Sequence, residues 1–199
     1  MCGIAGIVSL DGSEVPIDIA YKMTIPLEHR GPNDTGDWSS ELCSLSHRRL
    51  SIIDLSRSGR QPLSNEDATL QLTCNGEIYN FDELRDDIET AGLAFTTTCD
   101  TEILPLGFSL FGEALFPRLK GMFAFALYDR EEGSIYLVRD HLGIKPLYYA
   151  EMGGNIVFSS SARAVALSPN VSRDLDPQAV GEFLQFRYVR SGKHMFRDV

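Results

Sequence analysis

The segment 121–129 constrains the fold of this chain more than any other. Its sequence, Gly-Met-Phe-Ala-Phe-Ala-Leu-Tyr-Asp, is apolar at both odd and even positions. Because successive side chains of a strand point to opposite faces, a strand with this sequence is covered on both faces. A Glu-Glu-Gly turn and the run 134–139 follow directly, which predicts an antiparallel partner. Such a strand requires at least two stacked layers together with covering helices.

Other segments predict further strands and helices. Hairpin-like spacing favours antiparallel sheets, and Asp176-Pro177 places an N-cap and a first-turn proline before the last helix. A turn-rich loop is expected at 29–34, and Asn80 with Glu83 suggests a capping box. The expected strands are 3–10, 42–50, 69–74, 146–150 and 155–159, and the expected helices are 16–27, 80–91, 102–111 and 177–186. Pattern alone therefore predicts an α+β sandwich.

Composition narrows the class of protein. A chain of 199 residues with 43% hydrophobic residues suits one domain with a substantial core. The net charge of −10 argues against a nucleic-acid partner. The apolar runs are too short to cross a membrane, and the N-terminus lacks the features of a secretory signal, so we expect a cytoplasmic protein. The four cysteines form no C-x-x-C pair, so no metal site is expected.

Cys2 follows the initiator methionine. Removal of Met1 would leave a thiol and a free α-amine on one residue, which is a nucleophile with its own base. A free α-amine titrates near ~7.7–8 and a thiol near ~8.5, so proton transfer between them is nearly balanced at neutral pH. Taken alone, Cys2 fits a small buried residue that begins a strand better than it fits a nucleophile, and the rest of the chain reverses that preference. If Met1 is retained, the base is tied up in an amide.

Three further segments are more polar than the predicted strands and helices that flank them. Arg49, at the end of a strand, can hold a carboxylate through two parallel hydrogen bonds, although it also fits a solvated strand end. Asn75-Gly76 can form an oxyanion hole or simply a strand-to-helix turn. Asp100 can accept a substrate ammonium or cap the following helix. Cys74 shares strand parity with Leu72 and is expected in the core.

Together these pieces resemble one family. Seven segments occur in the order 2–6 (CGIAG), 29–32 (HRGP), 49–54 (RLSIID), 75–80 (NGEIYN), 100–102 (DTE), 121–125 (GMFAF) and 139–148 (RD followed by G, KPLY). They are similar to the glutaminase domain of class II glutamine amidotransferases, the N-terminal-nucleophile type, and most similar to that of glutamine-dependent asparagine synthetase. The resemblance covers nearly the whole chain, so 1–199 is interpreted as a single glutaminase domain.

The resemblance implies a four-layer αββα sandwich of two antiparallel sheets. It also implies that the chain hydrolyses the side-chain amide of L-glutamine to glutamate and ammonia through a Cys2 thioester. The oxyanion hole would be formed by Asn75 and Gly76. The remaining implied contacts are to glutamine itself, with Arg49 on its α-carboxylate, Leu50, Ser51, Ile52 and Ile53 lining the pocket, and Glu77 and Asp100 on its α-amino group.

The resemblance also implies partners. Ammonia would pass to a C-terminal synthetase domain that is absent from this chain, and a second copy of the chain is a further candidate partner. No cofactor is expected in this domain, since neither a pyrophosphate loop nor a G-x-x-x-x-G-K-[ST] loop is present; ATP and Mg²⁺ are expected only in the synthetase domain. Two alternatives stay open: an amidotransferase that uses another acceptor, and a non-hydrolytic module that keeps the fold.

Two positions depart from the family pattern. Asn33 stands where Asp is expected after His-Arg-Gly-Pro, and Ser161 stands where Glu is expected after Phe-Ser-Ser. The first concerns hydrogen bonding in a loop, and the second concerns contacts to a partner domain. All positions that hydrolysis requires are present.

Overall fold

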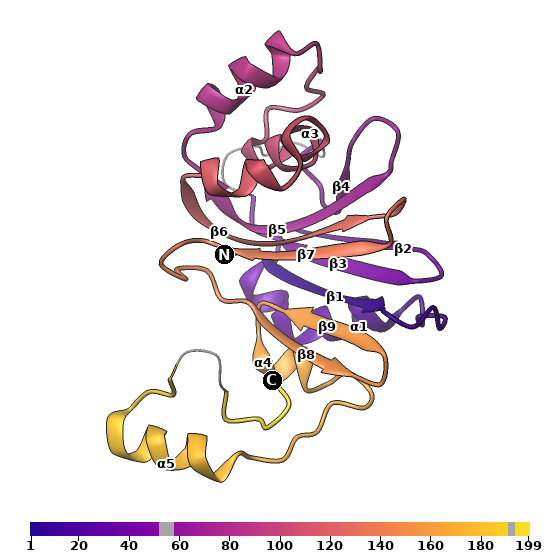
Figure 1. Cartoon of the computed structure of the whole chain (residues 1–199). Helices are drawn as coiled ribbons and strands as arrows, with labels where there is room; N and C mark the ends of the chain where they lie inside the picture. Colours follow the sequence, from indigo (N-terminus) through magenta and orange to yellow (C-terminus); the bar gives the residue numbers. More distant parts are fainter. Residues whose placement is uncertain (52–57, 191–193) are drawn as a thin grey trace.

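Two antiparallel sheets stack face to face between two layers of helices (Figure 1). The computed structural model describes residues 1–51, 58–190 and 194–199. The first sheet has the strand order β2-β3-β1-β9-β8, and the second has the order β4-β5-β6-β7. The strands are β1 (Gly3–Ser9), β2 (Asp34–Ser39), β3 (Cys43–Arg49), β4 (Leu63–Ser64), β5 (Leu70–Ile78), β6 (Gly121–Asp129), β7 (Ser134–Arg139), β8 (Tyr148–Met152) and β9 (Asn155–Ser159).

Helices cover the outer face of each sheet. In Figure 1, α2 and α3 lie over the β4–β7 sheet, and α1 and α4 lie over the other sheet. The helix α5 lies at the end of the molecule beyond β8, and a bridge between Leu175 and Phe196 ties the segments that flank it. The α-helices are α1 (Ile19–Thr24), α2 (Phe81–Thr90), α3 (Ile103–Phe111), α4 (Ala162–Val165) and α5 (Pro177–Phe186), and the 3-10 helices are η1 (Ile25–Arg30), η2 (Asp100–Glu102) and η3 (Gly112–Arg118).

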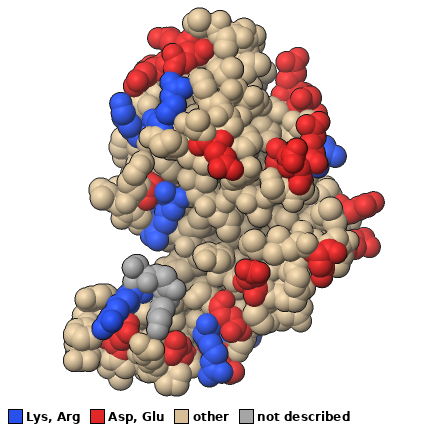
Figure 2. Space-filling view, in the orientation of Figure 1, with Lys and Arg blue, Asp and Glu red and all other residues tan. Residues whose placement is uncertain are grey.

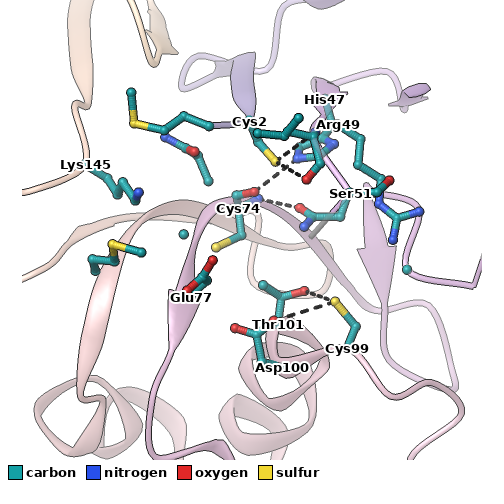
Figure 3. A pocket seen from close by; sticks show the side chains of 17 residues that line it. Cys2, His47, Arg49, Ser51, Cys74, Glu77, Cys99, Asp100, Thr101 and Lys145 are labelled. Atoms are coloured by element: carbon teal, nitrogen blue, oxygen red, sulfur yellow. Dashed lines mark hydrogen bonds between the residues drawn. The ribbon is translucent and has the colours of Figure 1, made fainter. Parts of the chain in front are cut away.

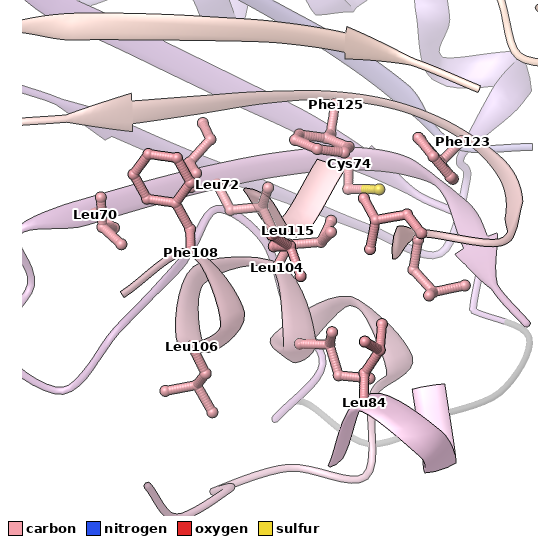
Figure 4. Close-up of a cluster of buried hydrophobic side chains, with 14 of the residues drawn as sticks. Leu70, Leu72, Cys74, Leu84, Leu104, Leu106, Phe108, Leu115, Phe123 and Phe125 are labelled. Carbon is pink, nitrogen blue, oxygen red and sulfur yellow. The ribbon is translucent and has the colours of Figure 1, made fainter. Parts of the chain in front are cut away.

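Three apolar clusters hold the four layers together. The largest lies between the β4–β7 sheet and α2 and α3, where Phe123 and Phe125 project from β6 (Figure 4). A second cluster packs β1, including Ile7, against α1 and α4. The third lies between the sheets, where Ala126 and Tyr128 of β6 meet Val8, Cys43, Leu45 and Phe158. The two sets of side chains of β6 therefore enter two different clusters, which confirms a strand covered on both faces and the four-layer sandwich.

The structure confirms most of the expected elements and corrects four. The edge strand β2 was not expected, and its segment begins within the predicted loop 29–34. The expected helix 16–27 is a short α1 followed by η1. Strand β5 continues to Ile78, so Asn75-Gly76 lies inside a strand rather than in a turn. The capping box is wrong, because the Asn80 side chain bonds the backbone of Arg118 and Lys120 instead of its own helix.

Acidic residues outnumber basic ones in this chain, with 28 Asp and Glu against 18 Lys and Arg. On the face shown in Figure 2, Asp and Glu side chains are spread over the whole view, and the basic side chains form smaller groups among them. Among the helices of the described ranges, none combines the length and the apolar character needed to cross a lipid bilayer.

Phe125→Ala should strongly destabilise the fold. The Phe125 ring is fully buried in the cluster under α3, so its removal should lower the free energy of unfolding by about 3–5 kcal/mol. Urea denaturation followed by far-UV circular dichroism measures the change. Tyr149→Ala is the control, because Tyr149 is 59% exposed and should change the unfolding free energy little. Equal unfolding midpoints for the two variants would contradict the layered core.

Candidate active site

A pocket of about 130 Å³ lies where the ends of β1, β3 and β5 meet (Figure 3). The strand register places these ends together, because Gly3 of β1 pairs with Arg48 of β3. Cys2, which precedes β1, therefore lies beside Leu50, which follows β3. The described residues that line the pocket include Met1, Cys2, His47, Arg49, Leu50, Ser51, Gln61, Cys74, Asn75, Gly76, Glu77, Asp100, Thr101 and Lys145.

The Cys2 thiol is half-buried at the inner end of β1. The Leu50 N–H donates to its Sγ at 3.3 Å, and the thiol lies 3.7 Å from the Leu50 carbonyl oxygen. Burial raises the pKa of the Cys2 thiol, and the positive charges of the Met1 α-ammonium, Arg49 and Lys145 offset part of this rise. Cys2 is therefore mainly a thiol at neutral pH, and its use as a nucleophile requires a base.

One edge of β5 faces the pocket. Strand β4 covers only Gln71 and Leu72 of β5. Within the described residues, the later part of β5 therefore pairs with a strand on one side alone, and that strand is β6. On the open side, the Cys74 N–H donates to the Gln61 side-chain oxygen at 2.6 Å, and the Ile78 N–H donates to Asp100 at 2.7 Å. Two side chains from elsewhere in the fold thus hold this edge in register.

The Gly76 N–H points into the gap between these two hydrogen bonds. Backbone N–H groups alternate in direction along a strand, so residues 74, 76 and 78 donate toward the same side. No side chain of the described residues accepts from Gly76. A side chain at this position is excluded, because a Cβ on Gly76 would lie 2.4 Å from the Met122 carbonyl oxygen. The glycine is required by close packing of β5 against β6.

Asn75 supplies a second unused donor. Its side chain is 1% exposed and lines the pocket, yet its Nδ2 has no hydrogen-bond partner among the described residues. Leaving a buried donor without a partner costs about 1–3 kcal/mol. The Asn75 amide and the Gly76 N–H are neighbouring donors without an acceptor in the described part of the chain. They are suited to bind a negatively charged oxygen or a carbonyl oxygen that enters the pocket.

Charges of both signs line the remaining walls. Arg49 ends β3 and is 7% exposed, and Asp100 is 3% exposed. Burial raises the pKa of the Asp100 carboxyl above its ordinary value, and the nearby Glu77 raises it further. A bound ammonium would reverse part of this rise. The pocket therefore offers cationic and anionic groups to one ligand that carries both charges.

Lys145 is a further buried cation of the pocket. It is 7% exposed and forms no ion pair with a described residue. Its backbone is fixed on both sides, since the Lys145 N–H donates to Asp140 at 3.0 Å and Arg139 Nε donates to the Lys145 carbonyl at 2.6 Å. The loop after β7 thus places a positive charge opposite β5 (Figure 3).

The structure brings together the described residues that the sequence analysis singled out. Cys2, Arg49, Leu50, Ser51, Asn75, Gly76, Glu77 and Asp100 all line the pocket. Ile52 and Ile53 lie outside the described residues. Asp100 does not cap a helix, because its carboxylate accepts from Ile78 instead. Cys74 is buried in the largest apolar cluster, as expected. Within 1–51, 58–190 and 194–199 there is no cluster of His, Cys, Asp and Glu suited to a metal ion.

Sequence reasoning missed His47, Gln61 and Lys145. His47 lies within the expected strand 42–50 and Lys145 within the segment 139–148, but the sequence gives neither residue a role. His47 Nε2 donates to the Cys74 carbonyl at 3.1 Å, and this bond ties β3 of one sheet to β5 of the other. Burial lowers the pKa of His47 to about 4, so the ring is neutral at physiological pH.

The chain belongs to the glutamine amidotransferase domain family, whose model matches residues 1–199. It is 35% identical to asparagine synthetase [glutamine-hydrolyzing] 1 of Bacillus subtilis over 95% of this chain and 30% of that protein. It is 39% identical to asparagine synthetase [glutamine-hydrolyzing] 2 of Arabidopsis thaliana over 83% of this chain and 28% of that protein. The chain thus spans about a third of the length of these relatives. The resemblance drawn from the seven segments is confirmed.

Solved structures confirm the fold. The glutamine phosphoribosylpyrophosphate amidotransferase from B. subtilis superposes with a TM-score of 0.67 at 24% identity, over 82% of this chain and 42% of that chain. A structure described as the allosteric regulatory enzyme of purine biosynthesis gives a TM-score of 0.69 at 24% identity, with the same coverage. At this identity the likeness concerns the layered architecture alone.

The neutral state of His47 should make stability depend on pH. Its pKa in the folded state is about 4 and its ordinary value is 6.5, so the unfolded chain binds the proton more readily between these values. The contribution of the neutral His47 ring to the free energy of unfolding is complete above pH 6.5. As the pH falls toward 4, this free energy decreases by up to about 3 kcal/mol. Urea denaturation at pH 4.5 and 7.5 measures the loss. His47→Gln, which keeps a donor in place of Nε2, should show a smaller loss; an equal loss would contradict the assignment.

Proposed function

We propose that this chain hydrolyses the side-chain amide of L-glutamine, with Cys2 as the nucleophile. The observation that carries the proposal is the pairing of the Cys2 thiol with two unused donors, Asn75 Nδ2 and the Gly76 N–H, in one pocket. Attack of a thiolate on a carboxamide develops negative charge on the carbonyl oxygen. Two preorganised donors would stabilise that charge without reorganisation.

The charged walls suit the amino-acid end of glutamine. Arg49 would bind the α-carboxylate, and Asp100 with Glu77 would bind the α-ammonium. The backbone around 50–53 would line the same part of the pocket. Since both charges of the ligand would be paired inside a closed site, ligands that lack either charge would leave a buried group unpaired and bind poorly.

The base would be the α-amine of Cys2 once Met1 is removed. In the chain as described, Met1 lines the pocket and the nitrogen of Cys2 is part of an amide. The raised pKa of the thiol makes a base necessary. A free α-amine titrates near ~7.7–8, so it would accept the thiol proton near neutral pH. Lys145 and Arg49 would help to hold the resulting thiolate.

The reaction would then proceed in two stages. The thiolate adds to the side-chain carbonyl, and ammonia leaves with the proton that the α-ammonium returns. Water, with the α-amine again as base, next hydrolyses the thioester, which releases glutamate and restores the thiol. Both tetrahedral intermediates place their oxyanion between Asn75 and Gly76.

We further infer that 1–199 is one glutaminase domain that delivers ammonia to a synthetase domain following it in a longer protein. The similarity to asparagine synthetases, about a third of whose length this chain spans, supports this. ATP and Mg²⁺ would act only in that second domain, whose acceptor would be aspartate. A cytoplasmic location and a homodimer remain predictions. Amidation of another acceptor is the alternative, and the sequence after Val199 distinguishes the two.

Cys2→Ala should abolish glutamate release and leave the fold intact. Cys2 supplies chemistry, whereas its side chain adds little to the apolar clusters. The measurement is glutamate formed from glutamine by the purified chain, with mass spectrometry to establish whether Met1 is present. Iodoacetamide provides a control, because Cys43, Cys74 and Cys99 are buried and the label should reach Cys2 first. A Cys2→Ala variant that keeps its rate would exclude the nucleophile assignment, and an inactive chain without Met1 would favour a non-hydrolytic module.

Asn75→Ala should reduce kcat and leave KM for glutamine nearly unchanged. Its Nδ2 would act on the oxyanion rather than on the bound substrate, and loss of one such donor typically lowers kcat about 10²–10³-fold. Steady-state kinetics of glutamate release measure both constants. Asn155→Ala, in the hairpin between β8 and β9, serves as the matched control and should behave as the unmodified chain. A rise in KM without a fall in kcat would place Asn75 on the substrate's amino-acid end instead.

A further inference from the structure

A second hollow of about 380 Å³ is lined by residues of η1, of the start of β8 and of the N-terminal end of α4. We call it the arginine hollow. The residues that line it include Arg30, Tyr148, Ser160, Ser161, Arg163 and His194. It shares no lining residue with the active-site pocket. Two arginines line it, and none of its described lining residues is acidic, in a chain whose net charge is −10.

Arg30 lines the hollow and also contacts the backbone of Cys2. Its Nε donates to the Cys2 carbonyl oxygen at 3.1 Å. Its Nη2 is buried and has no hydrogen-bond partner among the described residues, and Arg30 forms no ion pair with them. Burial lowers the pKa of Arg30, as expected for a cation that is removed from water without a counter-ion among the described residues. A buried guanidinium donor normally has an acceptor, so its lack of one is unusual.

The other polar groups of the hollow are available as well. Arg163 is exposed and forms no ion pair within the described residues. The Ser161 hydroxyl forms no hydrogen bond with a described residue, whereas its backbone N–H donates to the Ser159 hydroxyl. One wall is aromatic, since the rings of Tyr148 and His194 meet edge to face at 5.4 Å between centroids. Burial lowers the pKa of His194, so this wall is uncharged at neutral pH.

We propose that the arginine hollow is a binding site for an oxyanion, either a phosphate or a carboxylate, held by Arg30, Arg163 and the Ser161 hydroxyl. Guanidinium groups form paired, charge-assisted hydrogen bonds with both kinds of anion. An anion in the hollow would be attracted by two guanidinium groups that have no acidic neighbour among its described lining residues. Because the same guanidinium holds the Cys2 carbonyl, binding also reaches the backbone of the residue that carries the thiol.

The test is titration of the ¹⁵N-labelled chain with inorganic phosphate, and separately with acetate, at constant ionic strength. Two or three charge-assisted contacts correspond to a Kd of about 1 mM. We expect saturable shifts of the Ser160, Ser161 and Arg163 amides, accompanied by a shift of Gly3, whose nitrogen is bonded to the Cys2 carbonyl carbon. Shifts with phosphate alone identify a tetrahedral anion, and shifts with both probes identify the shared oxyanion chemistry.

Two variants and one control make the result decisive. Arg163→Gln should raise the Kd about tenfold, since it removes one charged contact. Ser161→Glu should place a carboxylate inside the hollow and abolish the phosphate shifts while the chain stays folded. Lys120→Gln, which removes an exposed cation elsewhere, should leave the Kd unchanged. The proposal is overturned if neither anion gives saturable shifts at these amides, or if Arg163→Gln binds as tightly as the unmodified chain. Binding is measured without turnover, so an inactive chain that still binds phosphate would count against the proposed hydrolysis alone.

Discussion

The open edge of β5 is the constraint on which the site depends. Three groups from distant parts of the chain fix it: His47 on the Cys74 carbonyl, Gln61 on the Cys74 N–H, and Asp100 on the Ile78 N–H. With these bonds made, the Gly76 N–H points to the open side of β5, and Asn75 is held in the same stretch of strand. The four-layer core supports this edge, because β6 packs into apolar clusters on both of its faces.

Elements with a strong apolar pattern could be predicted from the sequence. The double-sided β6, the hairpin of β8 and β9, and the Asp176 cap of α5 were all expected, and each follows from local chemistry. Strand β2 could not be predicted, because its sequence Asp-Thr-Gly-Asp-Trp-Ser reads as a turn. It becomes a strand only by pairing with β3 at the edge of the sheet. Gly76 also resembles a turn residue locally, but close packing against Met122 is its actual reason.

The residues of the site likewise fall into two groups, those that the sequence predicts and those that it does not. Cys2, Arg49, Asn75 and Asp100 could be singled out from motifs, and the structure places all four on one pocket, although Asn75 lies inside β5 and not in the expected turn. Lys145 and Gln61 could not, because their nearness to Cys2 arises from the stacking of sheets and from the loop held by Asp140. The pattern also gave no sign that Asp100 would support a backbone N–H, nor that Arg30 would hold the Cys2 carbonyl.

The central position of β1 has a consequence for the order of folding. Strand β1 lies between β3 and β9, and the Ile4 N–H donates to the Ser160 hydroxyl across 156 residues of sequence. Contacts of such long range form late, because the loop they close costs entropy before the contact is gained. Strand β1 is synthesised long before β9, so it gains its second neighbour only when β9 is available. The residue that precedes β1, Cys2, is therefore left beside a strand with one neighbour until most of the described chain has been made, so the pocket around its thiol takes shape only when the sandwich closes.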